Sequence, residues 1–153
     1  MTTSTEPQTP DHALAGVTAR LLAACASTAG PLGLGCAALA IVALLLPAPG
    51  MPTPLLMGVL AAVPVERGLA LRLRFDAGLF EDLAHTTVPL PRALTSLDQA
   101  LQAMGLRRAA PAPRAMDDRA RGARRLALWH AGCVALQCLV LVAGVGASRM
   151  AAS

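Results

Sequence analysis

Two long stretches without a formal charge constrain this chain more than any other feature. Residues 21–65 contain no Asp, Glu, Lys, Arg or His over 45 positions, and residues 126–148 contain only His130 over 23 positions. About 20 helical residues, rising 1.5 Å each, cover the ~30 Å hydrocarbon core of a bilayer. The chain is 55% hydrophobic and only 14% charged, whereas soluble domains carry about 25% charged residues. Both observations indicate a membrane protein.

The second stretch predicts one transmembrane helix, with its most continuous part at Leu126–Gly146. The first stretch is interrupted at residues 47–54 by four prolines and a glycine, which a continuous helix does not accommodate. Residues 21–72 are therefore expected to form a transmembrane helical hairpin with a tight proline turn. Only 11 uncharged residues, 55–65, follow this turn, so a second limb that inserts halfway is the alternative.

The expected fold is an all-α integral membrane protein: an N-terminal helical hairpin, cytoplasmic amphipathic helices and a C-terminal transmembrane helix. The predicted parts are a disordered polar tail at 1–20, the hairpin at 21–72, an Arg-rich helical segment at 73–125, a transmembrane helix at 126–148 and a short tail at 149–153.

Orientation follows from the arginines. Residues 66–125 hold 11 of the 13 arginines, and short Arg-rich loops stay in the cytoplasm. This asymmetry predicts a multi-pass protein of a bacterial inner membrane, with the central segment cytoplasmic and the last helix running outward. The N-terminus is expected in the cytoplasm if the hairpin is complete, and outside if its second limb does not cross.

The central segment is predicted to contain two amphipathic helices. The first extends the hairpin's second limb to about His85, with its apolar face at Val65, Leu69, Leu73, Phe80 and Leu83. In the second, Thr95 or Ser96 is the expected cap, and Gly105 stands where a terminal glycine belongs. Its apolar face is the candidate interaction site, for a protein partner, the headgroup region or the first helix; it comprises Leu94, Leu97, Leu101 and Met104.

Four arginines near the start of the last helix are candidate contacts for anionic lipid headgroups: Arg119, Arg121, Arg124 and Arg125. Nucleic acid is not an expected partner, because this basic cluster lacks interleaved aromatic residues and any known binding motif. The acids beside it are expected to form helix pairs, among them Asp117 with Arg121.

Polar residues within the spans are the other candidates. An ionisable residue in a membrane segment is a functional candidate by default, and His130 also begins the soft-ligand pair His130-x-x-Cys133. The favoured interpretation is that Trp129 and His130 anchor the helix at headgroup depth, and that Gln137 donates an interhelical hydrogen bond. The four cysteines form no C-x-x-C motif and are interpreted as small buried apolar residues. Small residues at positions 26, 29, 30, 33 and 37 favour close helix packing in the first span.

The chain contains no Walker loop, G-x-S-x-G or H-E-x-x-H motif, so no enzymatic activity and no cofactor are expected. The leading hypothesis is a membrane anchor, scaffold or accessory subunit that acts through its cytoplasmic helical segment. The alternative is a haem- or metal-associated redox subunit that uses His130. A transporter component is disfavoured, because the sequence suggests no carboxylate or arginine inside the membrane to form a substrate path.

The topology can be tested with reporter fusions. A reporter fused after Ser153 is expected to lie outside the cytoplasm, and one inserted near Ala110 to lie inside it, because the Arg-rich segment is retained. Alkaline phosphatase and fluorescent-protein fusions at the two sites report these locations. Phosphatase activity of the fusion at Ala110 would contradict the prediction.

Overall fold

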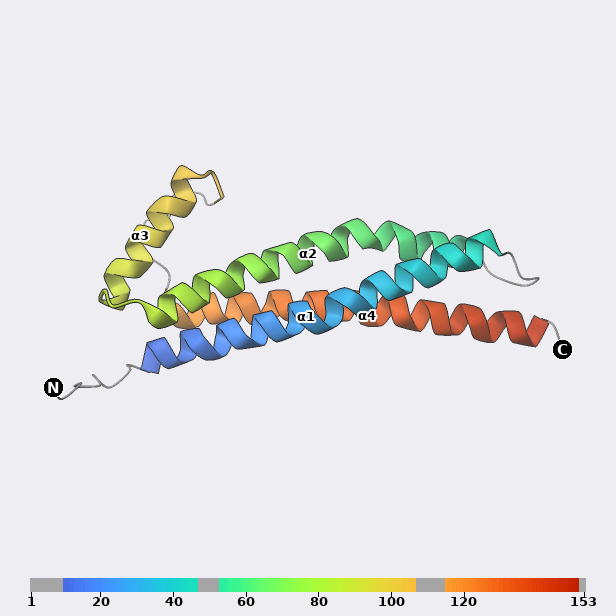
Figure 1. The fold of residues 1–153 in the computed structure, drawn as a ribbon, viewed down its shortest axis with the longest axis horizontal. Coiled ribbons are helices and arrows are strands. Elements are labelled where there is room, and N and C mark those ends of the chain that lie inside the picture. The colour runs from blue at the N-terminus through green and yellow to red at the C-terminus, as the bar shows by residue number, and fades with distance from the viewer. Residues whose placement is uncertain (1–9, 47–52, 107–114, 152–153) are drawn as a thin grey trace.

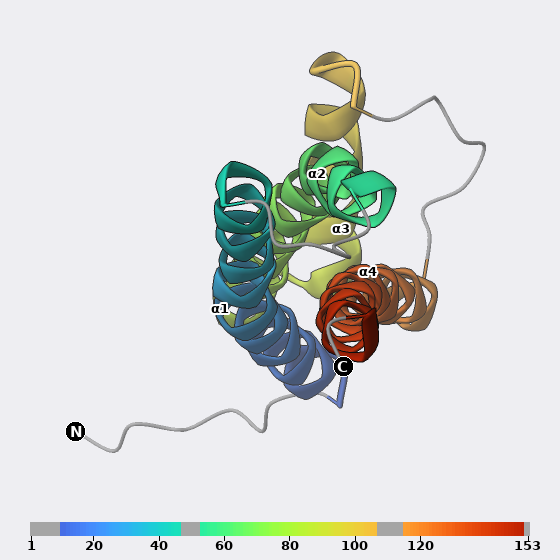
Figure 2. The same cartoon turned by 90° about the vertical axis from the view of Figure 1, so that its right-hand side faces the viewer.

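The protein was analysed as a computed structural model, which describes residues 10–46, 53–106 and 115–151. This part of the chain forms four helices and no strand: α1 (Pro10–Leu45), α2 (Thr53–His85), α3 (Leu90–Ala103) and α4 (Met116–Ala151). The three long helices lie side by side, while α3 leans away from them at one end (Figure 1). In the end-on view, α1, α2 and α4 surround a common interior (Figure 2). The predicted all-α architecture is confirmed, and three helices are long and apolar enough to cross a membrane.

The bundle has two chemically different ends. The start of α1, the end of α2 and the start of α4 lie together, and we call this the charged end because it carries Arg and Asp or Glu side chains on all three helices (Figure 1). Away from it lies the apolar section, made of residues 21–45, 53–65 and 126–148. Its α1 and α4 parts contain 25 and 23 residues, which at 1.5 Å per residue is about 35 Å, enough to cross a bilayer.

Large apolar side chains cover the outside of the apolar section. Between 58% and 70% of the surface of each of five representative residues is exposed: Leu32, Leu39, Leu136, Leu139 and Val142. A continuous apolar surface of this kind is costly in water, whereas hydrocarbon chains solvate it without cost. The outer surface therefore agrees with the length and composition of the helices in indicating a membrane protein.

Two clusters of buried side chains hold the helices together. The larger lies toward the charged end around Leu22 and Leu73, both fully buried, and includes the alanines of α1 that face α2. The smaller lies in the apolar section, where Cys36 and Ala40 of α1 meet Leu56 of α2. Of the small residues at 26, 29, 30, 33 and 37, Ala29 is half-buried and the others are buried, as close packing of this helix requires.

α2 pairs with α1 as the second limb of a helical hairpin. α2 is one continuous helix that ends at His85, as predicted, despite Pro64 within it. Its first turns pack Leu56 and Val59 against α1 at the end of the bundle remote from the charged end. α2 therefore runs beside the whole apolar part of α1. The predicted proline turn at 47–54 lies almost entirely outside the described residues.

Two expected boundaries differ from the structure. Residues 10–20 were predicted to be a disordered tail, but α1 already begins at Pro10. These residues are ordered because Ala15, Thr18 and Ala19 are buried against the charged-end extensions of the other helices. The remainder of the predicted tail, residues 1–9, lies outside the described residues.

The cap of α3 is the second difference. α3 begins at Leu90, with a proline in its first turn, and not at Thr95 or Ser96. Both hydroxyl groups donate backward along the helix, from Thr95 to the Pro91 carbonyl (2.8 Å) and from Ser96 to that of Ala93 (2.9 Å). Gly105 follows the helix with φ +71°, the left-handed conformation that favours glycine at this position.

Candidate functional site

Glu66 is a fully buried carboxylate at the meeting point of α1, α2 and α4. Its orientation follows from helical periodicity, because Val59, Glu66, Leu73 and Phe80 recur every seven residues and all are buried. The expected apolar face of this helix included Val65 instead, but Val65 is 61% exposed. The packed face of α2 therefore runs through Glu66, one residue beyond the position expected.

Four groups form a hydrogen-bonded cluster, called the Glu66 network below: Glu66, Arg67, His130 and the Gly30 carbonyl. Arg67 donates from Nε to Glu66 Oε2 (2.8 Å) and from Nη2 to Glu66 Oε1 (2.6 Å). Its Nη2 also donates to the carbonyl oxygen of Gly30 on α1 (2.6 Å). His130 Nε2 lies 3.0 Å from Glu66 Oε1. Because an ionised carboxylate only accepts hydrogen bonds, Nε2 is the donor, and the network joins all three long helices.

Gly33 makes room for the carboxylate. A Cβ atom at position 33 would lie 2.8 Å from Glu66 Cδ and 2.8 Å from Glu66 Oε2, closer than atoms pack. Two residues further along α1, a Cβ atom at Gly35 would meet nothing within 4 Å. The site therefore requires a residue without a side chain at position 33. The sequence showed Gly33 only as one member of a stripe of small residues.

The expected pairing of His130 with Trp129 at one surface of the helix is wrong. Trp129 is 64% exposed, whereas His130 is fully buried and faces Glu66. Successive residues of a helix point about 100° apart, so the two aromatic side chains face different surroundings. His130 Nδ1 has no hydrogen-bond partner among the described residues. One nitrogen of the ring is therefore fully engaged and the other is unpartnered.

The interhelical hydrogen bond expected from Gln137 is also absent. Gln137 is buried on the same face of α4, and neither atom of its amide has a partner in the described part of the chain. Nearby, the cysteine side chains of two helices approach each other: Cys36 Sγ of α1 lies 3.4 Å from Cys138 Sγ of α4. Both remain free thiols. Their proximity could not be predicted from a chain separation of 102 residues.

Glu66 and Arg67 lie within a helix that is long and apolar enough to cross a membrane, and Glu66 is buried inside the bundle. Both residues stand just after the uncharged stretch, within the hairpin predicted at 21–72. The signal that could have found Glu66 is its seven-residue spacing from Val59 and Leu73. No group of three or more His, Cys, Asp or Glu residues with metal-binding proximity occurs among residues 10–46, 53–106 and 115–151.

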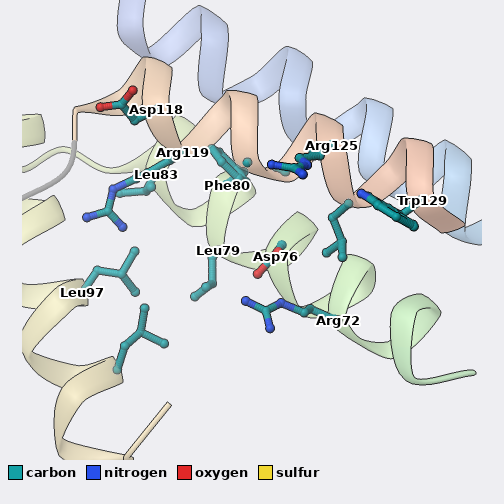
Figure 3. Close-up of a pocket in the computed structure, with 14 residues that line it drawn as sticks. Arg72, Asp76, Leu79, Phe80, Leu83, Leu97, Asp118, Arg119, Arg125 and Trp129 are labelled. Carbon is teal, nitrogen blue, oxygen red and sulfur yellow. The ribbon is translucent and has the colours of Figure 1, made fainter. Parts of the chain in front are cut away.

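The predicted interaction face of α3 is divided between the interior and the surface. Leu94 is buried in the larger cluster, and Leu97 packs against it. Met104 is 60% exposed. Leu97 and Leu101 line a groove of about 420 Å³ between α3, α2 and α4, together with Leu79, Phe80, Leu83 and Trp129 (Figure 3).

The four candidate headgroup arginines lie in different surroundings. Arg119 donates to Asp98 of α3 (2.6 Å) and is largely buried. Arg125 lines the groove of Figure 3. Arg121 and Arg124 line a second groove, between α1 and α4, and Arg121 forms an ion pair with Asp118 rather than with Asp117.

Comparisons of the chain with protein-family models, with curated proteins and with solved structures find no match.

The steric role of Gly33 can be tested by two matched substitutions. Gly33→Ala is expected to lower the free energy of unfolding by about 1–3 kcal/mol, because the added methyl group must displace the Glu66 carboxylate. Gly35→Ala is the control, since its methyl group points into open space on the same helix. Thermal unfolding in a mild detergent measures both. Equal melting temperatures for the two variants would contradict the assigned role.

Proposed function

We propose that this protein is a small multi-pass inner-membrane protein without catalysis of its own, which acts as an anchor, scaffold or accessory subunit. The charged end is assigned to the cytoplasm, because its arginines would be retained there during insertion. The lipid bilayer and a protein partner are its binding partners in this proposal. The docking surface for the protein partner is the groove of Figure 3.

The observation that carries the proposal is the chemistry of this groove. Leucine side chains from α2 and α3 form its walls, among them Leu79, Leu83 and Leu97 (Figure 3). Leu101 also lines it and is only partly buried. Three arginines and two acids line the groove, so the formal charges of its lining sum to +1; they are Arg72, Arg119, Arg125, Asp76 and Asp118. A helical or extended segment with apolar side chains and an acidic flank would match both the walls and the charge.

The second groove supports a contact with lipid. Arg121 and Arg124 lie beside three apolar side chains of α1: Leu14, Val17 and Leu21. Leu21 begins the apolar section, so an acyl chain could continue along α1 while its anionic headgroup contacts the arginines. Of the four arginines expected to contact headgroups, we therefore propose these two.

The alternative of a haem or metal subunit has weaker support. His130 Nε2 is engaged by Glu66, and His130 lines none of the described grooves. A ligand on this ring nitrogen would have to break the bond to a fully buried carboxylate.

The docking surface can be tested with a charge placed on α3. Leu101→Asp is expected to reduce recovery of a partner in mild detergent at least about tenfold, because a carboxylate in an apolar interface costs more than 1.4 kcal/mol of binding. Met104→Asp is the matched control, since Met104 directly follows the same helix and is exposed but does not line the groove. Quantitative mass spectrometry of the purified complexes measures recovery, with membrane abundance as the reference. Equal losses for both variants would exclude this groove as the docking surface.

The lipid contact can be tested by counting the anionic lipids that remain bound after purification. Replacing Arg121 and Arg124 together with Gln is expected to remove most of the retained phosphatidylglycerol or cardiolipin, since each basic residue contributes ~1 kcal/mol near an anionic surface. Replacing Arg72 and Arg74 with Gln removes the same charge from α2, outside this groove. Native mass spectrometry of the two variants provides the comparison. A similar loss of bound lipid in both variants would show that lipid binding depends on the net charge of this end and not on the groove.

A further inference from the structure

We propose that the Glu66 network is a proton-binding site inside the bundle, in which His130 takes up the proton and packing of α4 against α1 and α2 depends on its occupancy. This inference is independent of the docking and lipid proposals, because it concerns the interior of the apolar section and neither groove includes His130.

The charges of the network balance only when His130 is neutral. Glu66 contributes one negative charge and Arg67 one positive charge, and the two side chains are joined by two hydrogen bonds. A proton on His130 would raise the sum to +1. Since Glu66 and His130 are both completely buried, this net charge would stand in the apolar interior, where an uncompensated charge is strongly unfavourable.

Nδ1, the second ring nitrogen of His130, makes protonation of His130 still less favourable while α4 is packed against α1 and α2, an arrangement that we call the closed bundle. His130 Nε2 already donates to Glu66, so an added proton goes to Nδ1. Nδ1 is buried and faces no acceptor among the described residues. A new N–H donor there would remain without a hydrogen bond until α4 moves and water or another acceptor reaches it.

The titratable groups around the site offer no compensating charge. α2 presents Glu66 and Arg67 to His130. α1 contributes the Gly30 carbonyl and, near Glu66, the thiol of Cys36, and α4 adds the thiol of Cys133. Both cysteines are free thiols and neutral when protonated. The closed bundle therefore favours neutral His130, and proton binding favours an arrangement in which α4 is separated.

The residues of the Glu66 network suit a proton as ligand better than a metal ion. Arg67 places a fixed positive charge on the carboxylate, which opposes a metal ion at the same oxygens. Within the described residues, Glu66 and His130 also have no third His, Cys, Asp or Glu at metal-binding distance. Histidine is the side chain that exchanges a proton between about pH 5 and pH 8.

The chain contains its own reporter of α4 packing. Cys36 on α1 and Cys138 on α4 hold their sulfur atoms 3.4 Å apart. Cys36 lies about one helical turn from Gly33, and Cys138 just over two turns from His130. An oxidant links them only while the two helices remain packed: each thiol gives up one proton and one electron, and the sulfur atoms join. In a variant with Cys25 and Cys133 replaced by Ser, these are the only two thiols.

The experiment measures disulfide formation in this variant, in membranes, with copper phenanthroline as oxidant. Between about pH 8 and pH 5 the cross-linking rate is expected to fall at least about fivefold relative to the same protein carrying His130→Gln. Glutamine retains an N–H donor for Glu66 and takes up no proton, so it corrects for the pH dependence of thiol oxidation itself. Glu66→Gln should move the loss of cross-linking to lower pH, because protonation then leaves two positive charges in the site.

An equal pH dependence in the His130 and His130→Gln proteins would overturn the proposal. If the His130→Gln protein does not cross-link at any pH, the test is instead the pH profile of cross-linking in the Glu66→Gln protein, compared with that of the protein with both residues intact. An unshifted pH profile in that variant would show that the network does not bind the proton.

Discussion

The burial of Glu66 is the constraint on which the arrangement of the three long helices depends. An ionised carboxylate in an apolar interior is tolerated only with hydrogen-bonding partners, and each partner comes from a defined place. His130 has to face inward from α4, Arg67 has to reach back to its neighbour, and the Gly30 carbonyl of α1 has to accept from the same guanidinium. Losing one partner of such a buried group typically costs about 3–5 kcal/mol. The network thereby relates the rotation of each helix to that of the other two.

Small side chains make this arrangement possible. Gly33 leaves the volume that the carboxylate occupies, and the alanines of α1 let α2 approach along the larger cluster. In lipid, association of apolar helices gains little from the hydrophobic effect, so close packing and interhelical hydrogen bonds take over its role. At the charged end, by contrast, Leu22, Leu73 and Phe80 form a conventional buried cluster, which extends the bundle beyond the apolar section.

The two halves of the molecule suit different tasks. The charged end presents grooves bordered by arginines, and Leu101 of α3, which lines one of them, is only partly buried. The apolar section presents leucine and valine side chains on its outside and buries His130 and Gln137. In the functions we propose, partners and lipid headgroups are bound at the charged end, while the Glu66 network responds to protons in the interior. α4 belongs to both halves, so a change in its packing would reach the groove that it borders.

The sequence by itself determined the all-α class, the three apolar helices and the segregation of charge, because helix length, hydropathy and proline breaks are local properties of the chain. It also located the glycine that ends α3. It did not determine which face of each helix is buried: it favoured Val65 over Glu66 and paired Trp129 with His130 at the membrane surface. Only the tertiary structure decided that Glu66, Arg67 and His130 meet, that Gly33 is the position that accommodates them, and that Cys36 lies beside Cys138. The physical reason is that these contacts depend on the relative rotation and register of helices whose contacting residues lie up to 102 positions apart in the chain, and no local pattern carries that information.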